Sequence, residues 1–131
     1  MSRYIDDAMS VAQTDGLPPQ AARRVIPGLC RLAVEAACTE AVRRRRLGRG
    51  EPHAAVEDLL TGLSGTKPLA ALALFDDEKR ASEVLSRLSK ERRDFADVYR
   101  MVNEGSHVEL PGPPIDLVRS AQKLAGWLQA L

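Results

Sequence analysis

Three polar residues with complementary chemistry lie near the end of a long amphipathic stretch: Arg100, Asn103 and His107. A histidine can take up or release a proton near neutral pH. An arginine can bind a phosphate through two hydrogen bonds and stabilise charge that develops on it, and an asparagine can orient either group. Together these side chains provide the groups needed for metal-free RNA cleavage, in which a 2′-hydroxyl attacks the adjacent phosphate. At helical spacing they fall on the flank of the apolar stripe, where a groove or an interface must lie.

The same stretch also has a purely structural interpretation. Gly105 and Ser106 would end the helix, His107 would bind nearby backbone, and Arg100 would pair with Glu104 one turn later. Spacing alone favours this structural interpretation over the catalytic one.

A run of arginines is the second candidate, a site for nucleic acid made of Arg43, Arg44, Arg45, Arg46 and Arg49. The run spans a full helical turn, so its members cannot all face one partner. Basic residues at a helix C-terminus interact favourably with the helix dipole, which predicts a solvated face that could also meet phosphates. The formal net charge is only +1, from 19 basic and 18 acidic residues, so any nucleic-acid binding must depend on a local patch.

Arg31 and Glu35 form an i, i+4 pair in an otherwise apolar stretch, and Glu35 could reach Arg100 or His107 across a bundle. We predict a supporting role for this pair. No metal site or cofactor is expected: His53 has no second histidine or cysteine near it. The acidic residues 76–78 are better explained as charges that cap a helix. No nucleotide-binding glycine motif and no serine-nucleophile motif occurs.

Length and composition predict one soluble domain that covers residues 1–131, since 131 residues suffice to bury a core and 44% of them are hydrophobic. Aromatic residues make up only 4%, which leaves few platforms for base stacking. Cys30 and Cys38 would lie roughly 12 Å apart along one helix, too far for a disulfide. They indicate a reducing, cytoplasmic setting, and no apolar run is long enough to span a membrane.

The apolar periodicity predicts an all-α helical bundle with two long central helices and shorter packing helices. Pro27 lies inside the first long helix, so we expect a kink there or two abutting helices. Gly105 is expected to cap the second long helix. The predicted helices span residues 3–14, 19–46 (the first long helix), 52–61, 69–75, 79–104 (the second long helix) and 115–130.

The stretch from Arg100 to His107 resembles the motif of the HEPN superfamily, small α-helical bundles found in prokaryotic toxins, CRISPR effectors and antiphage systems. Its members carry an arginine and a histidine four to six residues apart at the end of a long helix. Here six residues separate them, and Met101 follows Arg100 where a polar residue is usual. The resemblance implies that Arg100 and His107 would be ribonuclease residues, and that two protomers would pair so that their motifs share a cleft.

A larger part of the chain, roughly residues 20–125, resembles the C-terminal tail of large bacterial SMC-like or AAA-type ATPases. It implies that this chain is a stand-alone or excised domain, with a partner ATPase in place of an ATPase part of its own. The segments that carry it are 25–31, 35–37, 43–53, 72–77 and 103–107.

Three functions follow as hypotheses. The leading one is a HEPN-like, metal-independent endoribonuclease, or a degenerate relative of one, in a prokaryotic defence or toxin context, acting on RNA as a homodimer. The alternative is a non-catalytic helical module that dimerises or docks on a partner ATPase. The third is a helical DNA-binding domain that uses Arg43 to Arg46.

Overall fold

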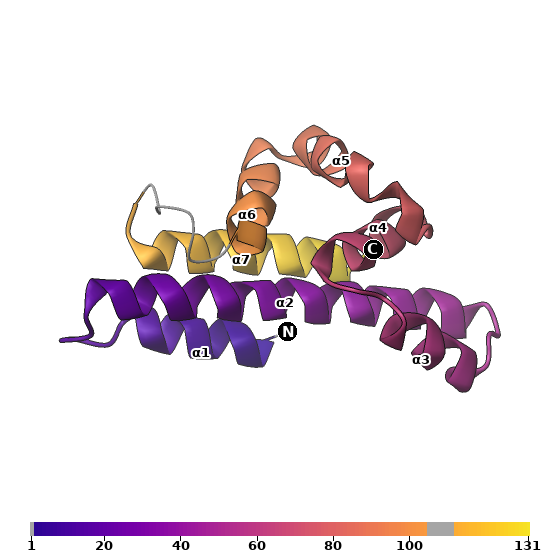
Figure 1. Ribbon diagram of the computed structural model, residues 1–131, viewed down its shortest axis with the longest axis horizontal. Helices are drawn as coiled ribbons and strands as arrows, with labels where there is room; N and C mark the ends of the chain where they lie inside the picture. The colour runs from indigo at the N-terminus through magenta and orange to yellow at the C-terminus, as the bar shows by residue number, and fades with distance from the viewer. Residues whose placement is uncertain (1, 105–111) are drawn as a thin grey trace.

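A computed structural model describes residues 2–104 and 112–131, and within these ranges every element is helical. The prediction of an all-α helical bundle is therefore confirmed. The elements, drawn in Figure 1, are α1 (Ser2–Ala12), α2 (Pro19–Gly48), α3 (His53–Thr61), α4 (Thr66–Phe75), the 3₁₀ helix η1 (Glu78–Glu83), α5 (Val84–Glu91), α6 (Arg93–Glu104) and α7 (Pro114–Gln129).

The long helix α2 organises the fold. Figure 1 shows α1 running antiparallel along one side of it and α7 running parallel along the other, while α1 and α7 also contact each other. Small buried residues on α2, among them Ala33, Ala37 and Ala41, allow the neighbouring helices to approach closely. Leu124 and Leu128 of α7 are fully buried against this layer. The core is therefore built mainly from aliphatic side chains, as the composition predicts.

Helix α2 passes through Pro27 without a break, so the alternative of two abutting helices is wrong. Proline lacks an amide proton and costs one intrahelical hydrogen bond. The Pro27 ring is buried, and the hydrophobic burial of this ring offsets part of that cost. Pro19 lies at the start of the helix, where an amide proton would have no intrahelical partner.

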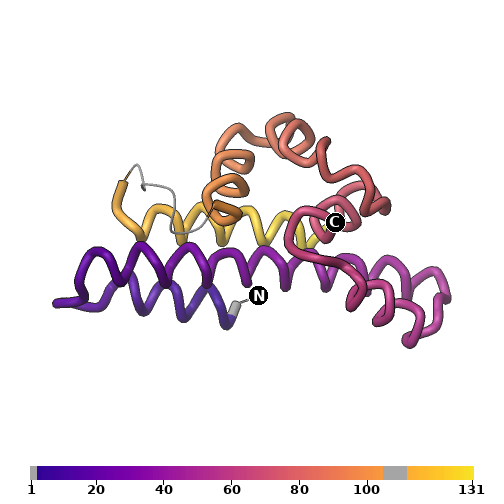
Figure 2. Tube along the Cα trace, viewed as in Figure 1, coloured from indigo at the N-terminus to yellow at the C-terminus, as the bar shows by residue number. Residues whose placement is uncertain are grey.

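The second long helix expected at 79–104 is instead divided into three parts, η1, α5 and α6. Arg92 separates α5 from α6 because its backbone is extended, with φ −153° and ψ 136°. Figure 2 shows the consequence: α4, η1, α5 and α6 form an arch over one side of α2 and α7. The chain turns there so that Phe95 reaches the core beside Trp127, with ring centroids 5.6 Å apart.

Candidate functional site

Arg100 and Asn103 lie on the last turns of α6 and are held by contacts within that helix. The Arg100 guanidinium is 3.5 Å from the carboxylate of Asp97, and Arg100 is largely exposed. The predicted pair with Glu104 is therefore replaced by one with Asp97. The Asn103 amide Nδ2 donates a hydrogen bond of 3.0 Å to the backbone carbonyl of Tyr99. His107 and Gly105, the other predicted members of this stretch, lie outside the described residues.

A polar hollow lies where α2, the start of α4 and the end of α6 meet. It consists of two adjacent pockets, of about 550 Å³ and about 220 Å³, whose linings share Lys67 and Asn103. Arg100 lines the smaller pocket, and Arg31 and Glu35 line the larger one. Four of the predicted site residues thus line two adjacent pockets, and Asn103 belongs to both.

Within this hollow the predicted pair of Arg31 and Glu35 is present, with 3.9 Å between the nearest nitrogen and oxygen. The closer partner of Glu35 is Thr66 at the start of α4, whose hydroxyl donates a hydrogen bond of 2.6 Å to the carboxylate. A carboxylate at a helix N-terminus is favoured by the helix dipole. Glu35 therefore fixes the start of α4 rather than bonding to Arg100.

Tyr99 forms part of the hollow's wall and is almost completely buried. Its hydroxyl has no hydrogen-bond partner within the described part of the chain. Burial raises the pKa of Tyr99 to about 12, an effect that the nearby Asn103 amide opposes. The phenol is therefore neutral at physiological pH and is not a general base.

The arginine run is engaged almost entirely by groups of the same chain. Arg43 forms two hydrogen bonds with the Glu57 carboxylate, at 2.7 and 3.0 Å. Arg44 donates to the backbone oxygens of Gln129 and Leu131. Among described residues each guanidinium of the run thus has an internal acceptor, which is the geometry of a structural role, and the predicted contact with nucleic acid stays a prediction.

Asp76 is the centre of the rest of the run. Its carboxylate lies 2.9 Å from Arg46 and 2.8 Å from Arg49, with Arg45 at 4.0 Å. Asp76 ends α4 in a left-handed conformation, with φ 58°. Sequence reasoning described residues 76–78 only as capping charge. This holds for Asp77, which caps η1 through the amide of Lys79, but it misses the role of Asp76.

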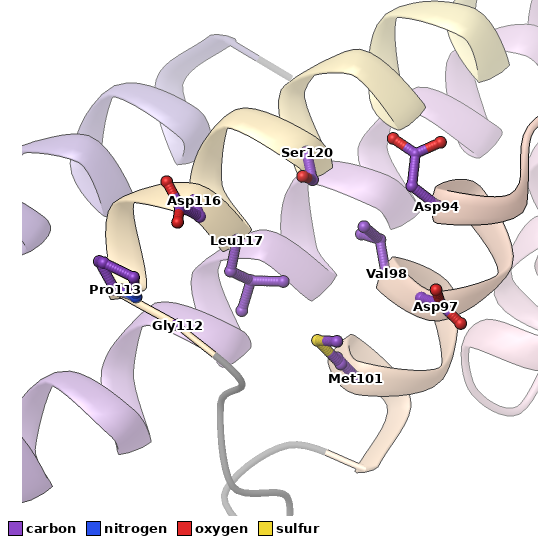
Figure 3. A pocket seen from close by; sticks show the side chains of 9 residues that line it. All are labelled: Asp94, Asp97, Val98, Met101, Gly112, Pro113, Asp116, Leu117 and Ser120. Atoms are coloured by element: carbon purple, nitrogen blue, oxygen red, sulfur yellow. The ribbon is translucent and has the colours of Figure 1, made fainter.

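A groove between α6 and α7 was not anticipated from the sequence. Figure 3 shows Asp94 and Asp97 of α6 on one side of it and Asp116 of α7 on the other. The apolar side chains of Val98, Met101 and Leu117 lie between them, and the groove has a volume of about 190 Å³. Among the described residues, the lining contains three carboxylates and no basic side chain. The lining residues are Asp94, Asp97, Val98, Met101, Gly112, Pro113, Asp116, Leu117 and Ser120.

Two further features concern metal binding and membrane insertion. In the part of the chain that the structure describes, no cluster of three or more histidine, cysteine or acidic side chains is arranged to hold a metal ion. No helix of residues 2–104 or 112–131 is both long and apolar enough to cross a membrane.

Comparisons with known proteins add no relative to this picture. No family model, no curated protein and no solved structure matches the chain.

Proposed function

We propose that this chain is a non-catalytic helical interaction module that docks a partner segment in the groove between α6 and α7. The groove itself is the observation that carries this proposal, because it combines an apolar floor with carboxylates at its rim (Figure 3). Interfaces depend on a few apolar anchors buried in pockets and surrounded by polar groups. The groove has this composition.

The contacts of the other candidate residues support docking over catalysis. The amide of Asn103 is bonded to its own helix, and Arg100 has a carboxylate beside it. Four of the five arginines of the basic run have a carboxylate within 4.0 Å, and Arg44 binds backbone oxygens. Groups held in this way contribute to stability first, and they would have to exchange these partners before binding a phosphate.

The test is a titration of the ¹⁵N-labelled protein with helical peptides that present leucine at i, i+3, i+4 and i+7. Three versions would carry lysine, glutamine or glutamate on the remaining face. If the groove binds a helix, the amide signals of Val98, Met101 and Leu117 should shift with at least one peptide, while those of α3 should not. If no peptide shifts these signals at millimolar concentration, the proposed function is wrong.

A second candidate function is a HEPN-like, metal-independent endoribonuclease. The observation that favours it is the polar hollow, where Arg100, Asn103 and the ammonium-bearing Lys67 line one space. On this reading Arg100 would bind the scissile phosphate, Asn103 would orient the reacting groups, and His107 would transfer the proton.

The ribonuclease hypothesis predicts cleavage of RNA by purified protein in the presence of a metal chelator. Replacement of His107 by alanine should abolish the cleavage, and Arg100→Ala should weaken it by about 10²-fold or more. Arg24→Ala, at an exposed position near the start of α2, is the matched control. Cleavage that persists in His107→Ala would exclude this function.

Both functions extend to proposed partners. We propose homodimerisation for the ribonuclease and docking on a larger ATPase for the interaction module. We propose a reducing, cytoplasmic setting for either function. Both cysteine thiols are free, and burial raises their pKa so that they stay protonated.

A further inference from the structure

The groove between α6 and α7 is small and has carboxylates at its rim. We propose that it binds a basic amphipathic helix, one that presents an apolar anchor residue flanked by lysine or arginine. This inference rests on the proposed function and adds to it the chemical class of the partner.

The size of the groove excludes a large ligand. Sites for small molecules and cofactors usually enclose about 300–1,000 Å³, whereas this groove has about 190 Å³. That volume suits one anchoring side chain together with the first atoms of its neighbours. The floor of Val98, Met101 and Leu117 offers such an anchor an apolar environment, and Met101 can adapt its shape to it.

The charge of the groove selects a cation. Asp94 and Asp97 are one helical turn apart on α6, and Asp116 lies on the α7 side; all three carboxylates stand at the rim of the groove and are turned away from its apolar floor (Figure 3). No lysine, arginine or histidine belongs to the described lining, and Arg92 and Arg100, which pair with Asp94 and Asp97, lie outside it. The groove therefore favours a cationic partner over RNA, an anionic lipid surface or an acidic peptide. Lysine and arginine can lay their aliphatic stems on the apolar floor while their charged ends reach the carboxylates.

The three carboxylates differ in how firmly the chain already holds them. Asp94 accepts two hydrogen bonds from Arg92, at 3.0 and 3.1 Å. Asp97 is paired more loosely with Arg100, at 3.5 Å. Asp116 has no ion pair among the described residues, so Asp116 and Asp97 are the carboxylates most available to a partner.

The groove's borders favour a helix over an extended peptide. An extended segment gains affinity by adding a strand to a sheet edge, and the described residues form no sheet. Two helices border the groove, and a helix packed against them can place residues i and i+4 on one side.

The experiment compares the three peptides introduced above by fluorescence anisotropy. The leucine–lysine peptide should bind about tenfold more tightly than the leucine–glutamine peptide, and the leucine–glutamate peptide should bind most weakly. Raising the salt concentration should weaken only the lysine peptide. Equal binding of all three peptides in the groove would overturn the charge selection and leave docking itself intact, whereas no binding would refute both.

Double variants test whether the preference for the lysine peptide comes from the carboxylates of the groove. Asp97→Asn with Asp116→Asn should weaken binding of the lysine peptide about tenfold and leave the glutamine peptide unchanged. The matched control replaces Asp6 and Asp58, two exposed aspartates of α1 and α3, by asparagine. Asp97→Lys with Asp116→Lys should reverse the preference toward the glutamate peptide. A preference for lysine that survives this reversal would overturn the proposal, and because a gain of binding is expected, misfolding cannot imitate the predicted result.

Discussion

Arg46 and Asp76 are thirty residues apart in the chain, and their side chains meet at 2.9 Å. Arg46 is mostly buried, with a side chain 19% exposed, and Asp76 is 32% exposed. The pair ties the end of α2 to the end of α4, and Arg49 adds a second contact to the same carboxylate. A charge lost from such a partly buried network leaves its partners uncompensated.

Asp76 should therefore be more sensitive to substitution than other surface aspartates. We expect Asp76→Asn to lower the free energy of unfolding by about 1–2 kcal/mol, because the charge is lost while asparagine still tolerates a left-handed backbone. Asp76→Ala should cost about 1 kcal/mol more, since alanine is strained at positive φ. Urea denaturation measures both. Asp58→Asn, exposed in α3, should change stability by less than about 0.5 kcal/mol, and equal effects at Asp58 and Asp76 would contradict the role given to the network.

Acid should destabilise the fold through the same network. Partial burial raises the pKa of Asp76, but hydrogen bonds and charges from Arg49 and Arg46 outweigh this and hold the pKa below its ordinary value of 3.8. Hydrogen bonds from arginine also lower the pKa of Glu57 and of Glu83 below 4.5. A lowered folded-state pKa stabilises the fold above the unfolded-state pKa, and this contribution disappears as the pH falls through the folded-state value.

The stability of the protein should accordingly be level above about pH 5.5 and fall steadily below about pH 4.5. Urea midpoints measured from pH 7 to pH 2.5 test this expectation. Asp76→Asn should flatten part of the decline, since the variant has lost one of the titrating groups. A decline that is unchanged in Asp76→Asn would show that other carboxylates cause it.

Arg45 should stabilise the end of α4. Its guanidinium donates hydrogen bonds to the carbonyls of Leu72 and Ala73, at 3.2 and 2.6 Å, in the last turn of the helix. The Leu72 carbonyl also accepts a hydrogen bond from the Asp76 amide. Arg45→Met should cost about 1–2 kcal/mol, and Arg45→Lys should cost less. Chemical denaturation of both variants, with Arg24→Met as control, measures this. A loss of DNA binding without a loss of stability would instead support the phosphate-binding hypothesis.

Local signals explain which parts of the fold could be predicted from the sequence. The bounds expected for α2 and α7 agree with the structure within two residues, because proline marks the start of each helix, glycine marks the end of α2, and the apolar stripes are unbroken. The break at Arg92 could not be predicted in this way. Leu88 and Phe95 are seven residues apart, so the apolar stripe continues in phase across the break, and no glycine or proline marks it. Packing of Phe95 against Trp127 favours the turn, and the sequence pattern does not show that contact.

The candidate site divides in the same way. The placement of Arg100 and Asn103 on one flank of a helix follows from periodicity, and in the structure both line the smaller pocket. The contact of Asp76 with Arg46, and the groove that has Asp97 on one side and Asp116 on the other, each involve residues from different helices. Such pairs depend on how helices pack, and a single sequence contains no pattern for them.

Cys30 and Cys38 should be unreactive in the folded protein. Both are fully buried, and burial raises the pKa of each thiol to about 12. The thiolate is the reacting species, and a thiol with so raised a pKa is almost entirely protonated at pH 8. Ellman's reagent should therefore modify neither cysteine within minutes under native conditions and both in 8 M urea, on the order of two thiols per chain. Rapid modification with an unchanged circular dichroism spectrum would contradict the packing of α2.

Tyr99→Phe tests the unpaired hydroxyl beneath the polar hollow. The Tyr99 ring is buried and its hydroxyl has no partner among the described residues. A buried hydroxyl without a hydrogen bond costs free energy, and phenylalanine keeps the ring while removing that group. We expect the variant to be as stable as the parent or more stable by up to about 1 kcal/mol in urea denaturation. Tyr4→Phe, at a half-buried position in α1, is the control. A loss of more than about 1 kcal/mol in the free energy of unfolding, seen in Tyr99→Phe and not in Tyr4→Phe, would show that the Tyr99 hydroxyl is hydrogen-bonded in solution. Water in the hollow would then be the nearest partner for it.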